Sequence, residues 1–199
     1  MILPPQIFCK VGWIARANMT TPSQNAFLNF GHVTRVADLE LPEEFDGDLD
    51  LSGLTSAVGL KLPRGVKSIF LTSLTSAEGL VFPEGVRYIN LAGLTSAVGL
   101  RLPEEVDALK LQGLQSAEGL VLPKRINDFL LLRGLTSAVG LVLPVEATAV
   151  DLNGLTSIEG LDLSKGEYGT IGLAGLTPEQ RDELRVRYPH QAKSIQPTP

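Results

Sequence analysis

Apolar residues recur along most of this chain in one fixed arrangement. The stretch from Leu62 to Leu80 reads LPRGVKSIFLTSLTSAEGL, and close variants of it follow one another on both sides. The glycine that closes each copy marks the period, with steps of 20, 20, 20, 21 and 20 residues. A repeat of this length is typical of a solenoid, in which each unit is one coil that buries its apolar residues only against its neighbours. The closing glycines are Gly59, Gly79, Gly99, Gly119, Gly140 and Gly160.

Each copy contains one alternating segment. Ile69 and Leu71 are apolar and flank the variable position 70, and this period of two predicts a β-strand whose two apolar side chains point inward. Degenerate copies at both ends bring the predicted strands to eight, stacked about 4.8 Å apart. The sequence therefore predicts a mainly β repeat solenoid of about eight coils, each of 20–21 residues, with a parallel β-helix as the alternative. The inward pairs are Leu28/Phe30, Leu49/Leu51, Ile69/Leu71, Ile89/Leu91, Leu109/Leu111, Leu130/Leu132, Val150/Leu152 and Ile171/Leu173.

Proline, glycine and hydroxyl residues separate the strands. Pro63 ends the short LxL run, and Gly79 suits backbone angles that a side chain would resist. Thr75 and Ser76 can hydrogen-bond to backbone groups of their own and adjacent coils. Two coils carry one extra residue before the strand, within residues 45–49 and 126–130, and we expect a β-bulge to absorb each.

Both ends of the stack need covers, because an open coil exposes its core and an unpaired strand edge. Thr177 and Gln180 form a capping-box pattern around Pro178, which predicts a helix with Leu184 and Tyr188 turned onto the last coil. The predicted divisions are residues 1–25 (N-terminal cap), 26–176 (repeat solenoid), 177–189 (C-terminal capping helix) and 190–199 (disordered tail).

The run LPxxVxxLxLxxL, seen from Leu62 to Leu74, resembles the LPxxLxxLxLxxN unit of short bacterial leucine-rich repeats, including those of enteric effector ubiquitin ligases. The resemblance covers residues 26–176 and implies a leucine-rich-repeat-like coil and a bacterial origin, but no ligase activity. This chain departs from the family at the asparagine position, where Leu74 and its equivalents stand. Ser76 and its equivalents are candidates to replace the backbone hydrogen bonds of the asparagine ladder; otherwise the coil is a different β-solenoid.

Composition narrows the setting. The chain has 199 residues, 44% of them hydrophobic, and a net charge of −5, so we expect no nucleic-acid partner, since such partners need a basic surface. Cys9 is the single cysteine and cannot form an internal disulfide. The first residues lack a classical signal peptide and no stretch is long enough to span a membrane. We expect a cytoplasmic protein, or one exported by a dedicated secretion system.

The usual catalytic and metal-binding patterns are missing from the sequence. His32 lies in the degenerate first coil, His190 in the predicted tail and Cys9 in the predicted N-terminal cap, so they make no convincing nucleophilic site. The glycines follow the coil period rather than a phosphate loop. We therefore expect no enzyme, no cofactor and no metal. Asp48 and Asp50 are the acid pair to test first if the solenoid cleaves carbohydrate.

The outward strand positions vary freely while the rest of the repeat does not. They bring aromatic and charged residues onto one face of the predicted sheet, a composition typical of binding hot spots; unselected surface variation is the alternative. The leading hypothesis is a non-catalytic module that binds another protein, with a bacterial effector as one setting. The other hypotheses are a carbohydrate-binding or carbohydrate-cleaving solenoid and an acidic mimic of nucleic acid. The candidate binding residues are Phe70, Tyr88, Asn90, Lys110, Gln112, Phe129, Leu131 and Arg133.

Overall fold

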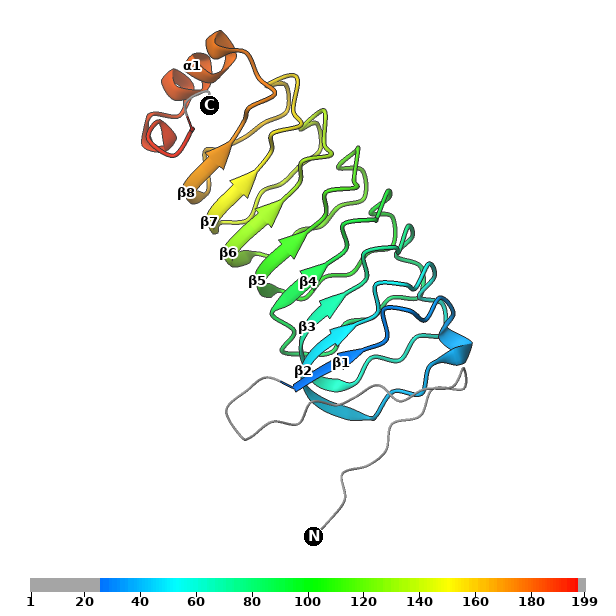
Figure 1. Ribbon diagram of the computed structural model, residues 1–199. Coiled ribbons are helices and arrows are strands. Elements are labelled where there is room, and N and C mark those ends of the chain that lie inside the picture. The colour runs from blue at the N-terminus through cyan, green and yellow to red at the C-terminus, as the bar shows by residue number, and fades with distance from the viewer. Residues whose placement is uncertain (1–25, 197–199) are drawn as a thin grey trace.

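A computed structural model describes residues 26–196 of the chain and shows a solenoid with one strand per coil. Its eight strands form one parallel sheet in the order β1 to β8, and Figure 1 shows them side by side, with helix α1 at the end that follows β8. The strands are β1 (Ala26–Asn29), β2 (Glu44–Asp50), β3 (Arg64–Phe70), β4 (Tyr88–Asn90), β5 (Glu105–Lys110), β6 (Arg125–Leu131), β7 (Glu146–Asp151) and β8 (Glu167–Gly172). The helices are α1 (Pro178–Arg187) and the short 3-10 helices η1 (Val36–Asp38) and η2 (Pro189–Gln191). The prediction of a mainly β repeat solenoid is confirmed.

The core is a set of continuous columns that run along the stack. Leu71 and Leu91 are both fully buried, and the same holds at the other inward strand positions, none of which is more than 1% exposed. Each enclosed side chain of this size contributes about 1.5–3 kcal/mol by leaving water. Because the columns pass through every coil, this stabilisation is shared between neighbours rather than confined to one coil.

The two long coils absorb their extra residue as predicted. In β6 the register slips between Ile126 and Phe129, and pairing is regular again from Phe129 onward. In β2 the slip lies between Glu44 and Asp48, so that Gly47 rather than Phe45 pairs with Val66. Phe45 is consequently only partly buried against the core.

The corners are held by short hydrogen bonds. The Ser76 hydroxyl oxygen accepts from the Glu78 amide of its own coil at 3.2 Å, and every equivalent serine does the same two residues on. The Thr95 hydroxyl instead donates to the Thr75 carbonyl of the preceding coil. Gly79 and the other closing glycines have φ values between +72° and +80°, the left-handed region that favours glycine.

The C-terminal end of the stack is covered. Thr177 caps α1 through the predicted capping box with Gln180, and Leu184 is fully buried. The predicted disordered tail is wrong for residues 190–196. Ile195 is 2% exposed and forms a parallel bridge with Ile171 of β8, while Gln191 Nε2 donates to the Gly166 carbonyl at 2.6 Å. One buried isoleucine and a few hydrogen bonds to the last strand order this segment.

Residues 1–25, which include the predicted N-terminal cap and Cys9, lie outside the described residues, as do residues 197–199. Between residues 26 and 196 no helix has the length and apolar character needed to cross a membrane.

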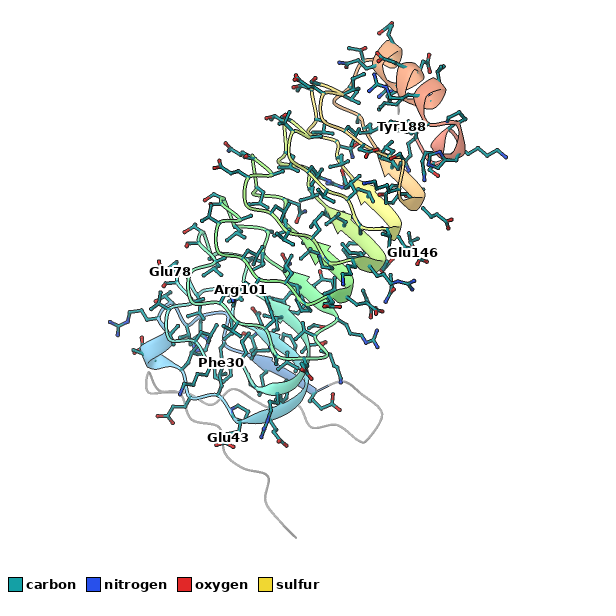
Figure 2. All side chains as sticks on the ribbon, turned by 180° about the vertical axis from the view of Figure 1, so that it is seen from behind. Phe30, Glu43, Glu78, Arg101, Glu146 and Tyr188 are labelled. Carbon is teal, nitrogen blue, oxygen red and sulfur yellow. The ribbon has the colours of Figure 1, made fainter. Side chains whose placement is uncertain are left out.

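On the side of the stack away from the sheet, exposed valines alternate with charged residues. Val58, Glu78, Val98, Glu118 and Val139 occupy one position of successive coils, and each of these valines is at least 58% exposed. Figure 2 views the molecule from behind and labels Glu78 together with Arg101, which belongs to the neighbouring column. The alternation keeps the valines of this column from forming a continuous apolar stripe.

Candidate binding face

The outward positions of the strands fall into register across the sheet. Phe70 pairs with Asn90, Asn90 with Lys110, and Lys110 with Leu131. A second column runs from Tyr88 through Ala108 to Phe129. The bulge in β6 does not turn Phe129 or Leu131 away from this face, because the pairing is regular again from Phe129 onward. The predicted binding residues of the strands therefore share one face.

Four of these residues form a cluster of three rings and one cation. The ring centroids of Phe70 and Tyr88 are 5.2 Å apart with the planes tilted by 39°, and those of Tyr88 and Phe129 are 6.2 Å apart in an edge-to-face arrangement. The ammonium nitrogen of Lys110 lies over the Tyr88 ring at 5.4 Å and over the Phe129 ring at 5.7 Å. Both geometries are attractive, since ring faces carry negative and ring edges positive partial charge. We call Phe70, Tyr88, Lys110 and Phe129 the aromatic cluster.

Ala108 makes the aromatic cluster possible. It lies between Tyr88 and Phe129 in the sheet register, and its small side chain is only 3% exposed. The two rings therefore meet across β5 above a methyl group. A larger side chain at position 108 would hold them apart.

The other predicted residues have separate environments. The Asn90 side-chain oxygen accepts from the Ala92 amide at 3.2 Å, a turn that Asp50 and Asp151 also form with the residue two positions on. Asn90 therefore stabilises the turn at the end of β4 in addition to being part of the outward face. Arg133 Nε donates to Asp151 Oδ2 at 2.5 Å.

Leu131 and Gln112 complete the predicted set. Leu131 is half-buried beside Lys110. Gln112 Oε1 is buried and has no hydrogen-bond partner among the described residues. Such an acceptor is costly when it is unsatisfied.

The residues considered for catalysis do not converge. Asp48 and Asp50 lie on the same face of β2, but Asp50 Oδ1 accepts from the Ser52 amide at 2.9 Å. His32 is exposed in the first coil, whereas His190 contacts the Leu163 carbonyl at 3.1 Å in the last. Over residues 26–196 no group of three or more histidine, cysteine, aspartate or glutamate side chains is placed to hold a metal ion.

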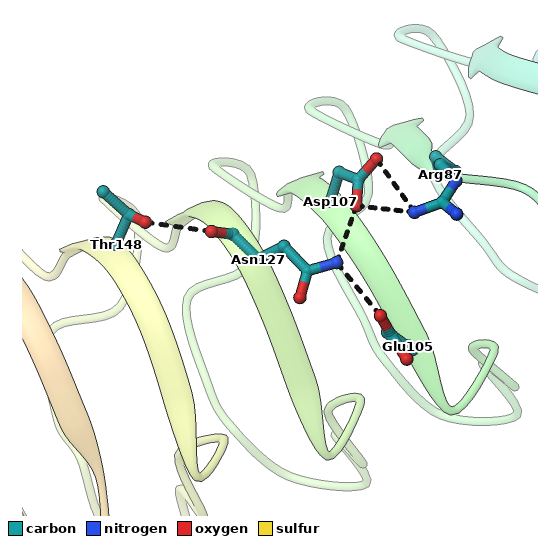
Figure 3. A network of polar contacts seen from close by, with 5 residues as sticks. All are labelled: Arg87, Glu105, Asp107, Asn127 and Thr148. Atoms are coloured by element: carbon teal, nitrogen blue, oxygen red, sulfur yellow. Dashed lines mark hydrogen bonds and ion pairs between the residues drawn. The ribbon is translucent and has the colours of Figure 1, made fainter.

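A polar network borders the face where the strands begin. Arg87 Nη1 donates to Asp107 Oδ1 at 3.1 Å, and Asn127 Nδ2 donates to Asp107 Oδ1 at 2.7 Å and to Glu105 Oε1 at 3.0 Å. The Thr148 hydroxyl donates to the Asn127 carbonyl, and Figure 3 shows these five residues running across successive coils. The network ties the early parts of β5, β6 and β7 together beside the aromatic cluster.

Sequence reasoning missed a cavity of about 630 Å³ between the fourth and fifth coils. It opens where β4 begins late, at Tyr88, whereas β3 and β5 begin at Arg64 and Glu105. The sequence gives little indication of this cavity. Gly85 has an equivalent in Gly65, which also has a positive φ value, yet β3 begins at Arg64, before Gly65.

No protein family, curated protein or solved structure matches this chain. Function is therefore argued from the face itself.

Proposed function

We propose that this protein is a non-catalytic binding module that holds another protein on the outward face of its sheet. The observation that carries the proposal is the aromatic cluster: three partly exposed rings and an ammonium group gathered at the middle of the sheet. Aromatic residues enriched at one place on a surface are typical of interface hot spots. The strands beneath them are fixed by the core columns, so binding does not require the face to be ordered first.

The carbohydrate alternative has less support. A sugar ring stacks on an open aromatic face, whereas here the Lys110 ammonium lies over both Tyr88 and Phe129. Mimicry of nucleic acid has less support too, because carboxylates such as Asp151 and Asp107 already pair with arginines of the same face.

The coil itself supports a further part of the proposal. One strand per coil is a feature shared with leucine-rich repeats, in which a helix or 3-10 helix follows the strand as η1 does in the first coil. We propose a leucine-rich-repeat-like coil of bacterial origin. The serine hydroxyls act within their own coil, so cross-coil contacts at this corner come instead from threonines such as Thr95. We propose that the protein acts in the cytoplasm, or is exported by a dedicated secretion system as an effector.

The test is capture of a partner from host lysate, followed by affinity measurement with the purified pair. Phe70→Ala, Tyr88→Ala and Arg133→Ala combined should weaken binding by at least tenfold, since truncating hot-spot residues typically costs more than about 1 kcal/mol each. Thr170→Ala, on the same sheet but away from the aromatic cluster, serves as the control. Unchanged affinity in the triple variant would refute the proposal, and selective binding on a glycan array would favour the carbohydrate function.

A further inference from the structure

The cavity between the fourth and fifth coils is a notch in the stack, and a second cavity of about 420 Å³ adjoins it between the fifth and sixth coils. Pairing of β4 with β3 and with β5 extends over three residues only, whereas β5 and β6 also pair at Glu105 and Val106. The prolines beside the notch reflect the opening. Pro83 and Pro103 are partly exposed, as is Pro42 in the second coil, while the equivalent Pro63, Pro123 and Pro144 are buried.

The walls of the notch are apolar. Phe82, Leu102 and the two prolines line it, together with Val81 and Val86. A Cβ added at Gly85 would meet no atom within 4 Å, so the space beside this turn is open. A volume of about 630 Å³ lies within the range of ligand sites in proteins and exceeds what one side chain fills.

The rim of the notch is charged, and its two ends differ in sign. Arg101, the repeat equivalent of Val81 in the fifth coil, lies at one end. Three residues further along its coil lies Glu104, which is the repeat equivalent of Glu84 in the fourth coil. Three residues of extended chain span about 10 Å. Within the described part of the chain neither Arg101 nor Glu84 forms an ion pair, whereas Arg87 and Glu104 are paired with Asp107 and Lys124.

We propose that this notch binds a short extended segment of a partner protein that carries an acidic residue, a bulky apolar residue and a basic residue in that order at alternate positions. Alternate residues of an extended segment point the same way. The apolar side chain would enter between Phe82 and Leu102, the acidic one would pair with Arg101, and the basic one with Glu84. First and fifth residues of such a segment are about 13 Å apart, which is comparable with the about 10 Å of extended chain from Arg101 to Glu104, the equivalent of Glu84.

This site is separate from the aromatic cluster, although the two are neighbours. Arg87 lines the notch, and Tyr88, the next residue, belongs to the aromatic cluster. One partner can contact both surfaces, but the inference does not rest on the proposed function of the sheet face.

The test uses the full chain labelled with ¹⁵N and titrated with an acetylated, amidated pentapeptide of sequence Glu-Ser-Leu-Ser-Lys. We expect saturable shifts of the amides of Gly85, Arg87 and Glu105. Replacing the peptide leucine by serine should abolish them, because the apolar walls then have nothing to enclose. Shifts confined to other coils, or equal binding of the serine peptide, would overturn the proposal.

Charge reversal tests the polarity of the rim. Arg101→Glu and Glu84→Lys should each weaken the pentapeptide about two- to fivefold, the range for exposed ion pairs. The double variant should prefer the reversed peptide Lys-Ser-Leu-Ser-Glu. Lys61→Glu, the equivalent of Arg101 two coils earlier and outside the notch, is the matched control. All these positions are exposed, so the variants are expected to fold; a double variant with the wild-type preference would contradict the assignment.

Discussion

The ammonium nitrogen of Lys110 lies 5.4 Å from the centroid of the Tyr88 ring. Within residues 26–196 Lys110 forms no ion pair, and its charge lies over the two rings of the aromatic cluster. Lys110→Met keeps the length and apolar contact of the side chain but removes the charge. We expect a loss of about 0.5–1 kcal/mol in the free energy of unfolding, the size of an exposed cation–π contact.

Urea unfolding compares Lys110→Met with Lys61→Met, which removes an exposed charge far from any ring of the aromatic cluster. If both variants lose the same free energy, the contact with the rings contributes nothing to stability.

The glycine that begins each GLTS turn, or the GLQS turn of the fifth coil, allows neighbouring coils to approach closely. A Cβ at Gly113 would lie 2.6 Å from the Ala92 carbonyl oxygen and 2.7 Å from that of Leu94. Both obstacles are backbone atoms of the preceding coil, so Gly113→Ala must push the two coils apart. We expect a loss of about 1–3 kcal/mol in the free energy of unfolding, as for other overpacked sites. Ser73 stands at the equivalent position of the third coil, so Ser73→Ala should be close to neutral in the same denaturation experiment.

The periodic features of the fold could be predicted because burial repeats in every coil. Leu71 and Leu91 are recognised as core residues because the same positions are apolar throughout. The candidate face was predicted for the converse reason, since Phe70 and Lys110 stand where the repeat varies. The contacts within the aromatic cluster required the structure, because they depend on the small Ala108 between two rings.

Features that occur once could not be read from the repeat. No local residue explains why β4 begins late. Gly65 and Gly85 both have positive φ values, but of these two glycines only Gly85 lines the notch. The order of residues 190–196 depends on a single apolar residue, Ile195, and on hydrogen bonds to distant carbonyls. A short polar segment with one isoleucine has no sequence pattern that would predict its packing against the last strand.

The docked C-terminal segment should stabilise the last coil. Ile195 is 2% exposed, and the Ile171 amide donates to the Ser194 carbonyl at 2.7 Å. Ile195→Ala should lower the free energy of unfolding by about 2–5 kcal/mol, or release the segment at a smaller cost. Hydrogen exchange of the Ile171 amide distinguishes these results, because release would remove its protection. Lys193→Ala, at an exposed neighbouring position, should leave both measurements unchanged; an Ile195→Ala protein with unchanged stability and unchanged exchange would show that the segment is not docked.

Glu118 separates two exposed valines on the back of the stack. Val98 is 65% exposed and Val139 is 58% exposed, and Glu118 occupies the same position in the coil between them. Glu118→Val would join three valines in one column, while Val121 and Val142 are exposed three residues further along their coils. We expect self-association at micromolar concentrations without loss of the fold, because large apolar patches promote contact between copies. Light scattering measures it, with Glu118→Gln as the uncharged control; a monomeric Glu118→Val protein would contradict this role of the charge.

Tyr168 should make the stability of the last coils depend on alkaline pH. Burial, with a smaller contribution from the nearby Asp162 carboxylate, raises the pKa of Tyr168 from 10.0 to about 12. Its hydroxyl donates to the Pro144 carbonyl at 2.8 Å, a bond that the ionised form cannot make. Because the folded pKa lies above the unfolded one, this stabilisation is complete below pH 10 and is lost as the pH rises toward 12. Tyr168→Phe should be less stable at neutral pH but lose less stability across that window, measured by urea unfolding at each pH. An identical alkaline decline in the two proteins would show that Tyr168 does not carry the effect.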